Sequence, residues 1–289
     1  MFRILQARLQ QGHRTMRYPD GPPPPLPDRF RGRLLMDRAR CPDTCRACAD
    51  ACPTTALTFP TPTSPRLDLG RCLFCTDCVA ACPTEALGHL RDPQLAARDR
   101  EALIVDPTVP ADRLEVAHAA LSAELQRVFG RSLKLRQVSA GGCNACESDL
   151  NVLSTVGWDI GRFGIQFVAS PRHADGLVLT GPIPDHMALA VQKTWAAIPG
   201  PKIAIAVGAC AISGGPYAGH PEVHDGLPGF PTTGDVHTND DASPLDEGHA
   251  RGTGGASAIP IALHIPGCPP HPLTILDGFL RLLGRLPAR

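Results

Sequence analysis

The sequence lacks a net charge: its 289 residues hold 28 Lys and Arg against 28 Asp and Glu. This balance gives no reason to expect a nucleic acid as partner. Long hydrophobic runs are also missing, since the best one, Ile203 to Ile212, falls short of the roughly 18 residues that a membrane-spanning helix needs. The first residues, MFRILQARLQQG, lack the apolar core and small-residue cleavage site of a signal peptide. We therefore expect a cytoplasmic protein with reduced cysteines.

Glycine-rich phosphate loops and dinucleotide fingerprints are missing too, so we expect neither NAD nor a flavin as cofactor. Cysteine, in contrast, is present at 12 positions, and eight of these lie between Cys41 and Cys82. This content is too low for a small disulfide scaffold, which typically exceeds roughly 8–10% cysteine. In a reducing compartment, cysteines spaced in this way indicate metal ligands or redox groups.

Residues 41–90 contain an internal repeat, because CPDTCRACADACPTTAL at Cys41 is echoed by CLFCTDCVAACPTEAL at Cys72. The second run has the spacing Cys-x2-Cys-x2-Cys-x3-Cys-Pro, with which bacterial ferredoxins hold 4Fe–4S clusters. In such doubled runs the fourth cysteine of each run binds the cluster of the other run. The predicted ligands are Cys41, Cys45, Cys48 and Cys82 for the first cluster and Cys72, Cys75, Cys78 and Cys52 for the second.

Two alternatives compete with this interpretation, namely zinc and disulfides. Zinc sites usually combine two close ligands with a second pair a dozen or more residues away, and disulfides conflict with the expected compartment. The first run departs from the ferredoxin spacing, because three residues separate Cys41 from Cys45. Cys41 is therefore the least regular of the eight predicted ligands.

Composition and periodicity divide the chain into four segments. We predict a basic, amphipathic and Pro-rich arm over residues 1–40, a 2×4Fe–4S ferredoxin-like domain over 41–92, a helical connector over 93–132, and an α/β domain over 133–289 with a long loop over 216–257. The predicted fold class is an α+β two-cluster ferredoxin domain followed by a flavodoxin-like α/β domain with a parallel sheet. Strands are expected at 133–138, 165–169, 176–181, 202–207 and 261–265, and helices at 111–129, 144–156, 186–198 and 271–286.

The remaining four cysteines each follow a predicted strand of the α/β domain. They are Cys143 and Cys146 in GGCNACE, Cys210 in GACAISGG and Cys268 in PGCPPHP. Ligands of open parallel sheets bind beyond the carboxyl ends of the strands, so three loops can bring four thiolates to one point. Neighbouring glycines allow the backbone to approach a bulky group. We predict a third 4Fe–4S cluster here, with zinc and buried structural cysteines as the alternatives.

These motifs, together with SPRHADGLVLTG, resemble the small subunit of NiFe hydrogenases and the related cluster-bearing subunit of respiratory complex I, over roughly residues 133–286. The N-terminal part resembles the two-cluster ferredoxin subunit of the same complexes, so the chain looks like a fusion of two subunits. The Cys143-x2-Cys146 spacing is the hydrogenase form, whereas complex I subunits carry adjacent cysteines. Ala145 stands where relatives usually have glycine.

The resemblance, which is greatest to formate-hydrogenlyase and energy-converting hydrogenases, implies an electron-transfer subunit without a catalytic centre of its own. Its implied partners are a NiFe large subunit or a complex I-like homologue, membrane-arm subunits, and a donor such as a formate dehydrogenase module or ferredoxin. It also implies a peripheral position on the inner face of the cell membrane. Two alternatives stay open: a complex I-like subunit without nickel, and a stand-alone iron–sulfur protein.

Several other side chains bear on chemistry. Glu147 matches an acidic position that the family associates with proton passage, although it equally suits the N-terminus of a helix. Arg172 and His173 in SPRHAD are expected to position the domain or its partner. Among the loop histidines His220, His224, His237 and His249, the spacing is irregular, which favours a solvated loop over a metal site.

Overall fold

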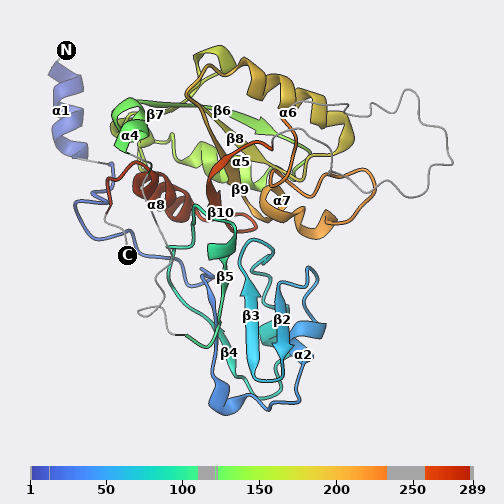
Figure 1. Cartoon of the computed structure of the whole chain (residues 1–289). Helices are drawn as coiled ribbons and strands as arrows, with labels where there is room; N and C mark the ends of the chain where they lie inside the picture. The colour runs from blue at the N-terminus through green and yellow to red at the C-terminus, as the bar shows by residue number, and fades with distance from the viewer. Residues whose placement is uncertain (1, 13, 110–120, 122, 233–257, 287–289) are drawn as a thin grey trace.

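The computed structural model describes residues 2–12, 14–109, 121, 123–232 and 258–286. Its C-terminal half contains a five-stranded sheet in the order β10-β9-β8-β6-β7, in which every neighbouring pair is parallel (Figure 1). The strands are β6 (Leu133–Ser139), β7 (Ile165–Phe167), β8 (Gly176–Thr180), β9 (Ile203–Val207) and β10 (Ile261–Ile265). The predicted parallel α/β sheet is therefore confirmed.

Helices cover both faces of this sheet because its strands are apolar on both sides. In β8, Leu177 and Leu179 pack into one hydrophobic cluster, whereas Val178 points to the opposite face and joins a second cluster. The first cluster includes side chains of α6 (Asp185–Ala197) and α7 (Ala209–Ser213), and the second those of α4 (Ala123–Phe129), α5 (Ala145–Val152) and α8 (Pro272–Leu282). Short 3₁₀ helices occupy Arg38–Arg40, Glu101–Leu103, Ile160–Phe163, Pro171–His173 and Gly215–Tyr217.

The N-terminal half shows the internal repeat as two equivalent turns of helix, α2 (Ala47–Asp50) and α3 (Asp77–Ala80). Each is followed by the Cys-Pro turn of its run and then by a strand. The hairpin of β2 (Leu57–Thr61) and β3 (Ser64–Asp68) is extended by β5 (Ile104–Val105), and β1 (Leu34–Met36) pairs with β4 (Leu87–His89). The predicted arm, residues 1–40, thus contributes a strand that pairs with the ferredoxin-like half.

The two halves are packed against each other. Apolar side chains of the ferredoxin-like half and of one sheet face belong to a single hydrophobic cluster. Ser213 Oγ donates to the carbonyl of Gly70 at 3.0 Å, and Ala97 exchanges backbone hydrogen bonds of 2.9 and 2.7 Å with His264 of the edge strand β10. The positions of the two halves are therefore fixed by direct contacts.

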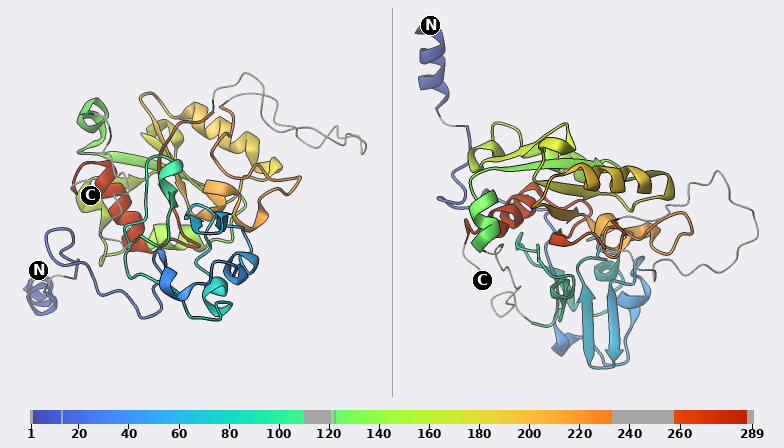
Figure 2. Two further views of the ribbon diagram at one scale, coloured as in Figure 1. Left: turned by 60° about the horizontal axis from the view of Figure 1, so that its bottom comes forward. Right: turned by 45° about the horizontal axis from the view of Figure 1, so that its top comes forward.

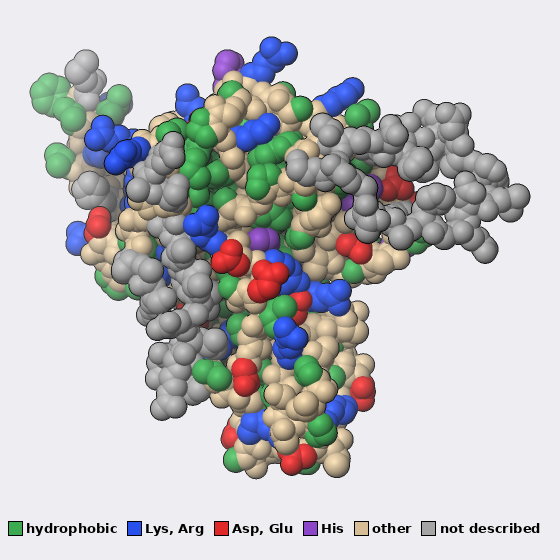
Figure 3. Space-filling model, viewed as in Figure 1, with side chains coloured by type: hydrophobic (Ala, Val, Ile, Leu, Met, Phe, Trp, Pro, Cys, Tyr) green, Lys and Arg blue, Asp and Glu red, His purple; other side chains and the backbone are tan. Residues whose placement is uncertain are grey.

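Helix α1 (Phe2–Gln11) stands away from this body (Figures 1 and 2). Its hydrophobic side chains are exposed, with Phe2 at 89% and Leu9 at 85%, and they show on the surface beside basic side chains (Figure 3). Within the described part of the chain, no helix combines the length and apolarity needed to cross a bilayer.

Parts of two predicted segments lie outside the described residues. The helix expected at 111–129 includes 111–120 and 122, and its remaining end forms α4. The expected loop over 216–257 includes 233–257, and with them His237 and His249.

Candidate functional site

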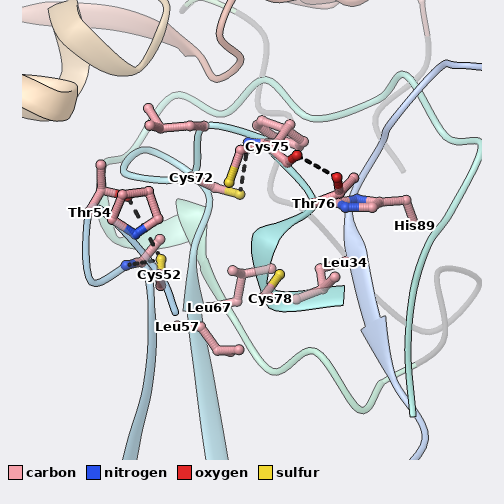
Figure 4. Close-up of a pocket in the computed structure, with 14 residues that line it drawn as sticks. Leu34, Cys52, Thr54, Leu57, Leu67, Cys72, Cys75, Thr76, Cys78 and His89 are labelled. Carbon is pink, nitrogen blue, oxygen red and sulfur yellow. Dashed lines mark hydrogen bonds between the residues drawn. The ribbon is translucent and has the colours of Figure 1, made fainter. Parts of the chain in front are cut away.

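The four cysteines predicted to bind the second cluster line one pocket. This pocket, with an empty volume of about 390 Å³, is otherwise lined mainly by apolar side chains such as Leu34, Leu57 and Leu67. Figure 4 shows the side chains of Cys52, Cys72, Cys75 and Cys78 arranged around it. Cysteines from both runs of the repeat, and from either side of the β2–β3 hairpin, thus meet at one place.

Backbone N–H groups donate hydrogen bonds to cysteine sulfurs in both halves of the repeat. Ala56 donates to Cys52 Sγ at 3.2 Å, and Phe74 donates to Cys72 Sγ at 3.4 Å. Ala86 donates to Cys82 Sγ at 3.2 Å, which repeats the Ala56 contact in the twin turn. Hydrogen bonds of this kind stabilise a metal-bound thiolate and set the potential of an iron–sulfur cluster.

In the set predicted for the first cluster, Cys48 lies near Cys41 and Cys45. Burial raises the pKa of the Cys48 thiol to about 11, and the nearby Cys41 and Cys45 add to this rise. Cys41 and Cys82 both pack against the hydrophobic core that contains Cys48. The irregular spacing after Cys41 therefore still leaves its side chain near that of Cys48.

The four dispersed cysteines also converge. Cys143 and Cys146 follow β6, Cys210 lies in α7 after β9, and Cys268 follows β10, so three strand ends supply them. Burial, followed by the charges of Glu147, Cys210, Cys268 and Cys143, raises the pKa of Cys146 well above its usual range. Cys143 and Cys268 are exposed, whereas Cys146 and Cys210 are partly buried.

Two glycines let the backbone approach sulfurs of this third site closely. A Cβ added to Gly208 would lie 2.5 Å from Cys146 Sγ, and one added to Gly215 would lie 2.9 Å from Cys210 Sγ. Glycine at both positions therefore allows the two sulfurs to approach the loops closely.

The electrostatics of the thiols fit the same chemistry. Burial and then the neighbouring thiols raise the pKa of Cys72 to about 12 and that of Cys78 to about 11, so the free thiolates repel one another in a poorly solvated place. Bound metal cations offset the free-energy cost of this repulsion, because a coordinating thiol is deprotonated outright. Among the residues that the structure describes, no three His, Cys, Asp or Glu side chains are placed to hold a single ion. A 4Fe–4S cluster makes a different demand, since each thiolate binds its own iron.

A second, larger pocket lies between the ferredoxin-like half and the third site. It has an empty volume of about 1180 Å³, and both Cys75 and Cys268 line it. The charge of Cys75 also contributes to the raised pKa of Cys268, after burial and Cys143. Cysteines of the predicted second and third sites thus face a common space.

Glu147 is 5% exposed and lies beside the third site. Its Oε1 accepts hydrogen bonds of 2.6 Å from both Ser139 Oγ and Thr180 Oγ1. The carboxylate therefore faces the ends of strands β6 and β8 and not the solvent.

The other residues that the sequence singled out, Arg172, His173, His220 and His224, lie in other parts of the α/β half. Arg172 and His173 form a 3₁₀ turn before β8. His220 accepts a 3.3 Å hydrogen bond from the backbone of Glu222, and His224 pairs with Asp185 at 3.0 Å, both in the segment after α7. The structure does not bring these histidines to the cysteines.

Sequence reasoning missed two residues next to the cysteines. His89 lines the pocket of Cys52 and Cys72, and Arg31 contacts the loop of Cys75. Arg31 lies in the basic segment FRGRLL, which belongs to the N-terminal part that resembles the ferredoxin subunit, but nothing in this segment indicates a contact with the Cys75 loop. His89 lies in no motif, and it pairs with Leu34 in the ladder of β1 and β4.

Two family models match the chain. The model for the NADH ubiquinone oxidoreductase 20 Kd subunit covers residues 143–282, and the 4Fe-4S dicluster domain covers residues 40–86. A probable membrane-bound hydrogenase subunit, mbhJ of Pyrococcus furiosus, is 34% identical over 57% of this chain and 81% of its own length. The chain belongs to the 20 Kd subunit family. It joins this domain to a 4Fe–4S dicluster domain, as the resemblance in the sequence indicated.

Relatives come from both branches that the sequence indicated. Formate hydrogenlyase subunit 7 of Escherichia coli is 33% identical over 66% of this chain, which spans 62% of that protein. An NADH-quinone oxidoreductase subunit of Heliobacterium modesticaldum is 30% identical over 51% of this chain and 69% of its own length. The 20 Kd family and the dicluster domain make the chain a 4Fe–4S-binding subunit of the oxidoreductase class.

Proposed function

We propose that the chain is the electron-transfer subunit of a membrane-associated NiFe hydrogenase complex of the formate-hydrogenlyase type. Three 4Fe–4S clusters would supply one-electron transfer between a NiFe large subunit and a donor module. Cys41, Cys45, Cys48 and Cys82 would hold the first, Cys52, Cys72, Cys75 and Cys78 the second, and Cys143, Cys146, Cys210 and Cys268 the third. The chain would lie peripherally on the inner face of the cell membrane.

The observation that carries this proposal is the shared pocket of Cys75 and Cys268. It supports a short step between the second and third sites. On the other side, the charge of Cys48, from the first set, contributes to the raised pKa of Cys78 of the second set, after burial, Cys75 and Cys52. Cys143 is exposed and does not line this shared pocket, so the side of the third site that carries Cys143 is where a large subunit would dock. A cluster site that is exposed on one side and close to a second cluster site on the other suits electron transfer through the chain.

The hydrogenase assignment rests on the spacing of Cys143 and Cys146 and on relatives named as hydrogenase subunits. The quinone-reducing alternative keeps support from the NADH-quinone oxidoreductase relative. Within the hydrogenase assignment, Glu147 would carry protons near the third site, because its buried carboxylate is held by two hydroxyl donors.

Purification of the native complex through a tag on this chain tests the proposal. Nickel in a co-purifying large subunit is the expected result, together with at least about 12 irons and 12 sulfides per copy of this chain, which three 4Fe–4S clusters require. An intact complex without nickel favours the complex I-like alternative, and a chain without partners favours a stand-alone iron–sulfur protein. Zinc at the third site would refute the ligand assignment.

A further inference from the structure

Arg31 crosses from the N-terminal arm to the loop that carries Cys75. Its Nη1 donates to the carbonyl of Phe74 at 2.9 Å and to that of Cys75 at 3.3 Å. Arg31 also lines the pocket shared by Cys75 and Cys268. One guanidinium therefore contacts the backbone of one predicted ligand loop at the place where it faces the next site.

The loop that Arg31 contacts has an unusual backbone. Phe74 and Thr76 adopt φ angles of 53° and 78°, in the left-handed region that side chains other than glycine rarely enter. In the twin run, Arg46 occupies the position equivalent to Thr76 and has a φ of −130°. A strained loop needs contacts that hold it. The hydrogen bonds from Arg31 to the carbonyls of Phe74 and Cys75 are such contacts.

Arg31 also brings a positive charge, and no carboxylate among the residues that the structure describes forms an ion pair with it, although Asp149 also lines the pocket shared by Cys75 and Cys268. The field of Arg31 reaches the pocket of the second site, since after burial it contributes to lowering the pKa of His89, which lines that pocket. A guanidinium keeps its charge throughout the physiological pH range. Such a charge favours whichever redox state of a nearby group has one more electron.

We propose that Arg31 is a positioning residue for the Cys72–Cys78 ligand loop, and that its charge raises the reduction potential of the group bound there. This inference rests on the proposed function, because it requires a cluster at the second site. It adds a residue outside the cysteine motifs to the control of electron transfer between the second and third sites.

Redox titration of the purified holo-complex, followed by electron paramagnetic resonance, tests the inference on Arg31→Gln and Arg31→Lys. In Arg31→Gln, one of the clusters should become harder to reduce by about tenfold in its equilibrium constant, or about 59 mV for one electron. Arg31→Lys keeps the charge, so its reduction potential should stay close to the wild-type value. The matched control is Arg29→Gln, which removes an arginine that lines the same pocket and should shift the potential much less.

Iron and sulfide content separates this inference from the proposed function. If the wild type lacks the clusters, the proposed function fails, and with it the premise for Arg31. If Arg31→Gln contains as much iron as the wild type and all its reduction potentials equal those of the wild type, the role of Arg31 is refuted and the proposed function stands. The same conclusion follows if Arg29→Gln shifts the potential as much as Arg31→Gln. Loss of one cluster's iron from Arg31→Gln, with full content in Arg29→Gln, supports the positioning role.

Discussion

Replacing Gly208 with alanine should remove the third cluster and leave the other two in place. Gly208 has φ +89° and ψ +157°, a region that is essentially restricted to glycine and costs other residues about 1–3 kcal/mol. The added Cβ would lie 2.5 Å from Cys146 Sγ, whereas non-bonded carbon atoms prefer about 3.5–4.0 Å. Relieving this overlap moves the sulfur by about 1 Å, which exceeds the roughly 0.5 Å tolerance of a preorganised site.

Iron and acid-labile sulfide measure this effect. The wild type should contain about 12 irons per chain and Gly208→Ala about 8, since each cluster holds four. Gly219→Ala is the matched control: Gly219 has φ +80°, and no described heavy atom lies within 4 Å of an added Cβ. It should lose about 1–2 kcal/mol of stability from backbone strain but no iron. Full iron content in Gly208→Ala, or equal losses in both variants, would refute the ligand role of Cys146.

Three further predictions concern buried polar groups. Tyr18→Phe removes the 2.8 Å hydrogen bond from the phenol to Asp277, which is 1% exposed, and should lower the free energy of unfolding by about 1.5–3 kcal/mol in denaturant titrations; an unchanged midpoint would contradict it. Glu147→Gln should slow turnover of the complex by roughly 10²–10⁴-fold if the carboxylate carries protons, at unchanged iron content, and normal turnover would remove Glu147 from the path. Burial lowers the pKa of His264, so the unfolded state binds the proton more readily. The free energy of unfolding should therefore fall as the pH drops below about 6.5. In His264→Gln this fall, measured by unfolding experiments at several pH values, should be shallower.

The sheet was predictable from the sequence because its signals are local. Short apolar runs such as KIAIAV lie between amphipathic helices, and they form strands within one or two residues of their expected bounds. The convergence of Cys143, Cys210 and Cys268 followed from the same pattern, since parallel strands end at one edge. The ligand assignments themselves remain predictions.

Contacts between distant segments were not predictable in the same way. Arg31 meets the Cys75 loop next to the pairing of Leu34–Met36 with Leu87–His89, and neither three-residue segment has enough alternation to indicate a strand. Likewise, nothing in the sequence around Ala97 indicates that it pairs with the edge strand beside His264. Such pairings depend on tertiary packing, which propensity and periodicity do not encode.

These long-range contacts determine how the second and third sites face each other. Tyr18 ties the arm to Asp277 of α8, and Arg31, farther along the same arm, contacts the Cys75 loop. Phe30 lies between them in sequence and packs edge-on against His271, three residues after Cys268, at 5.4 Å between ring centroids. Electron tunnelling weakens steeply with distance, so a segment that touches both ligand loops constrains the step between them. Residues 18–31, which carry no cysteine, therefore help to fix the distance that an electron would cross between the proposed second and third clusters.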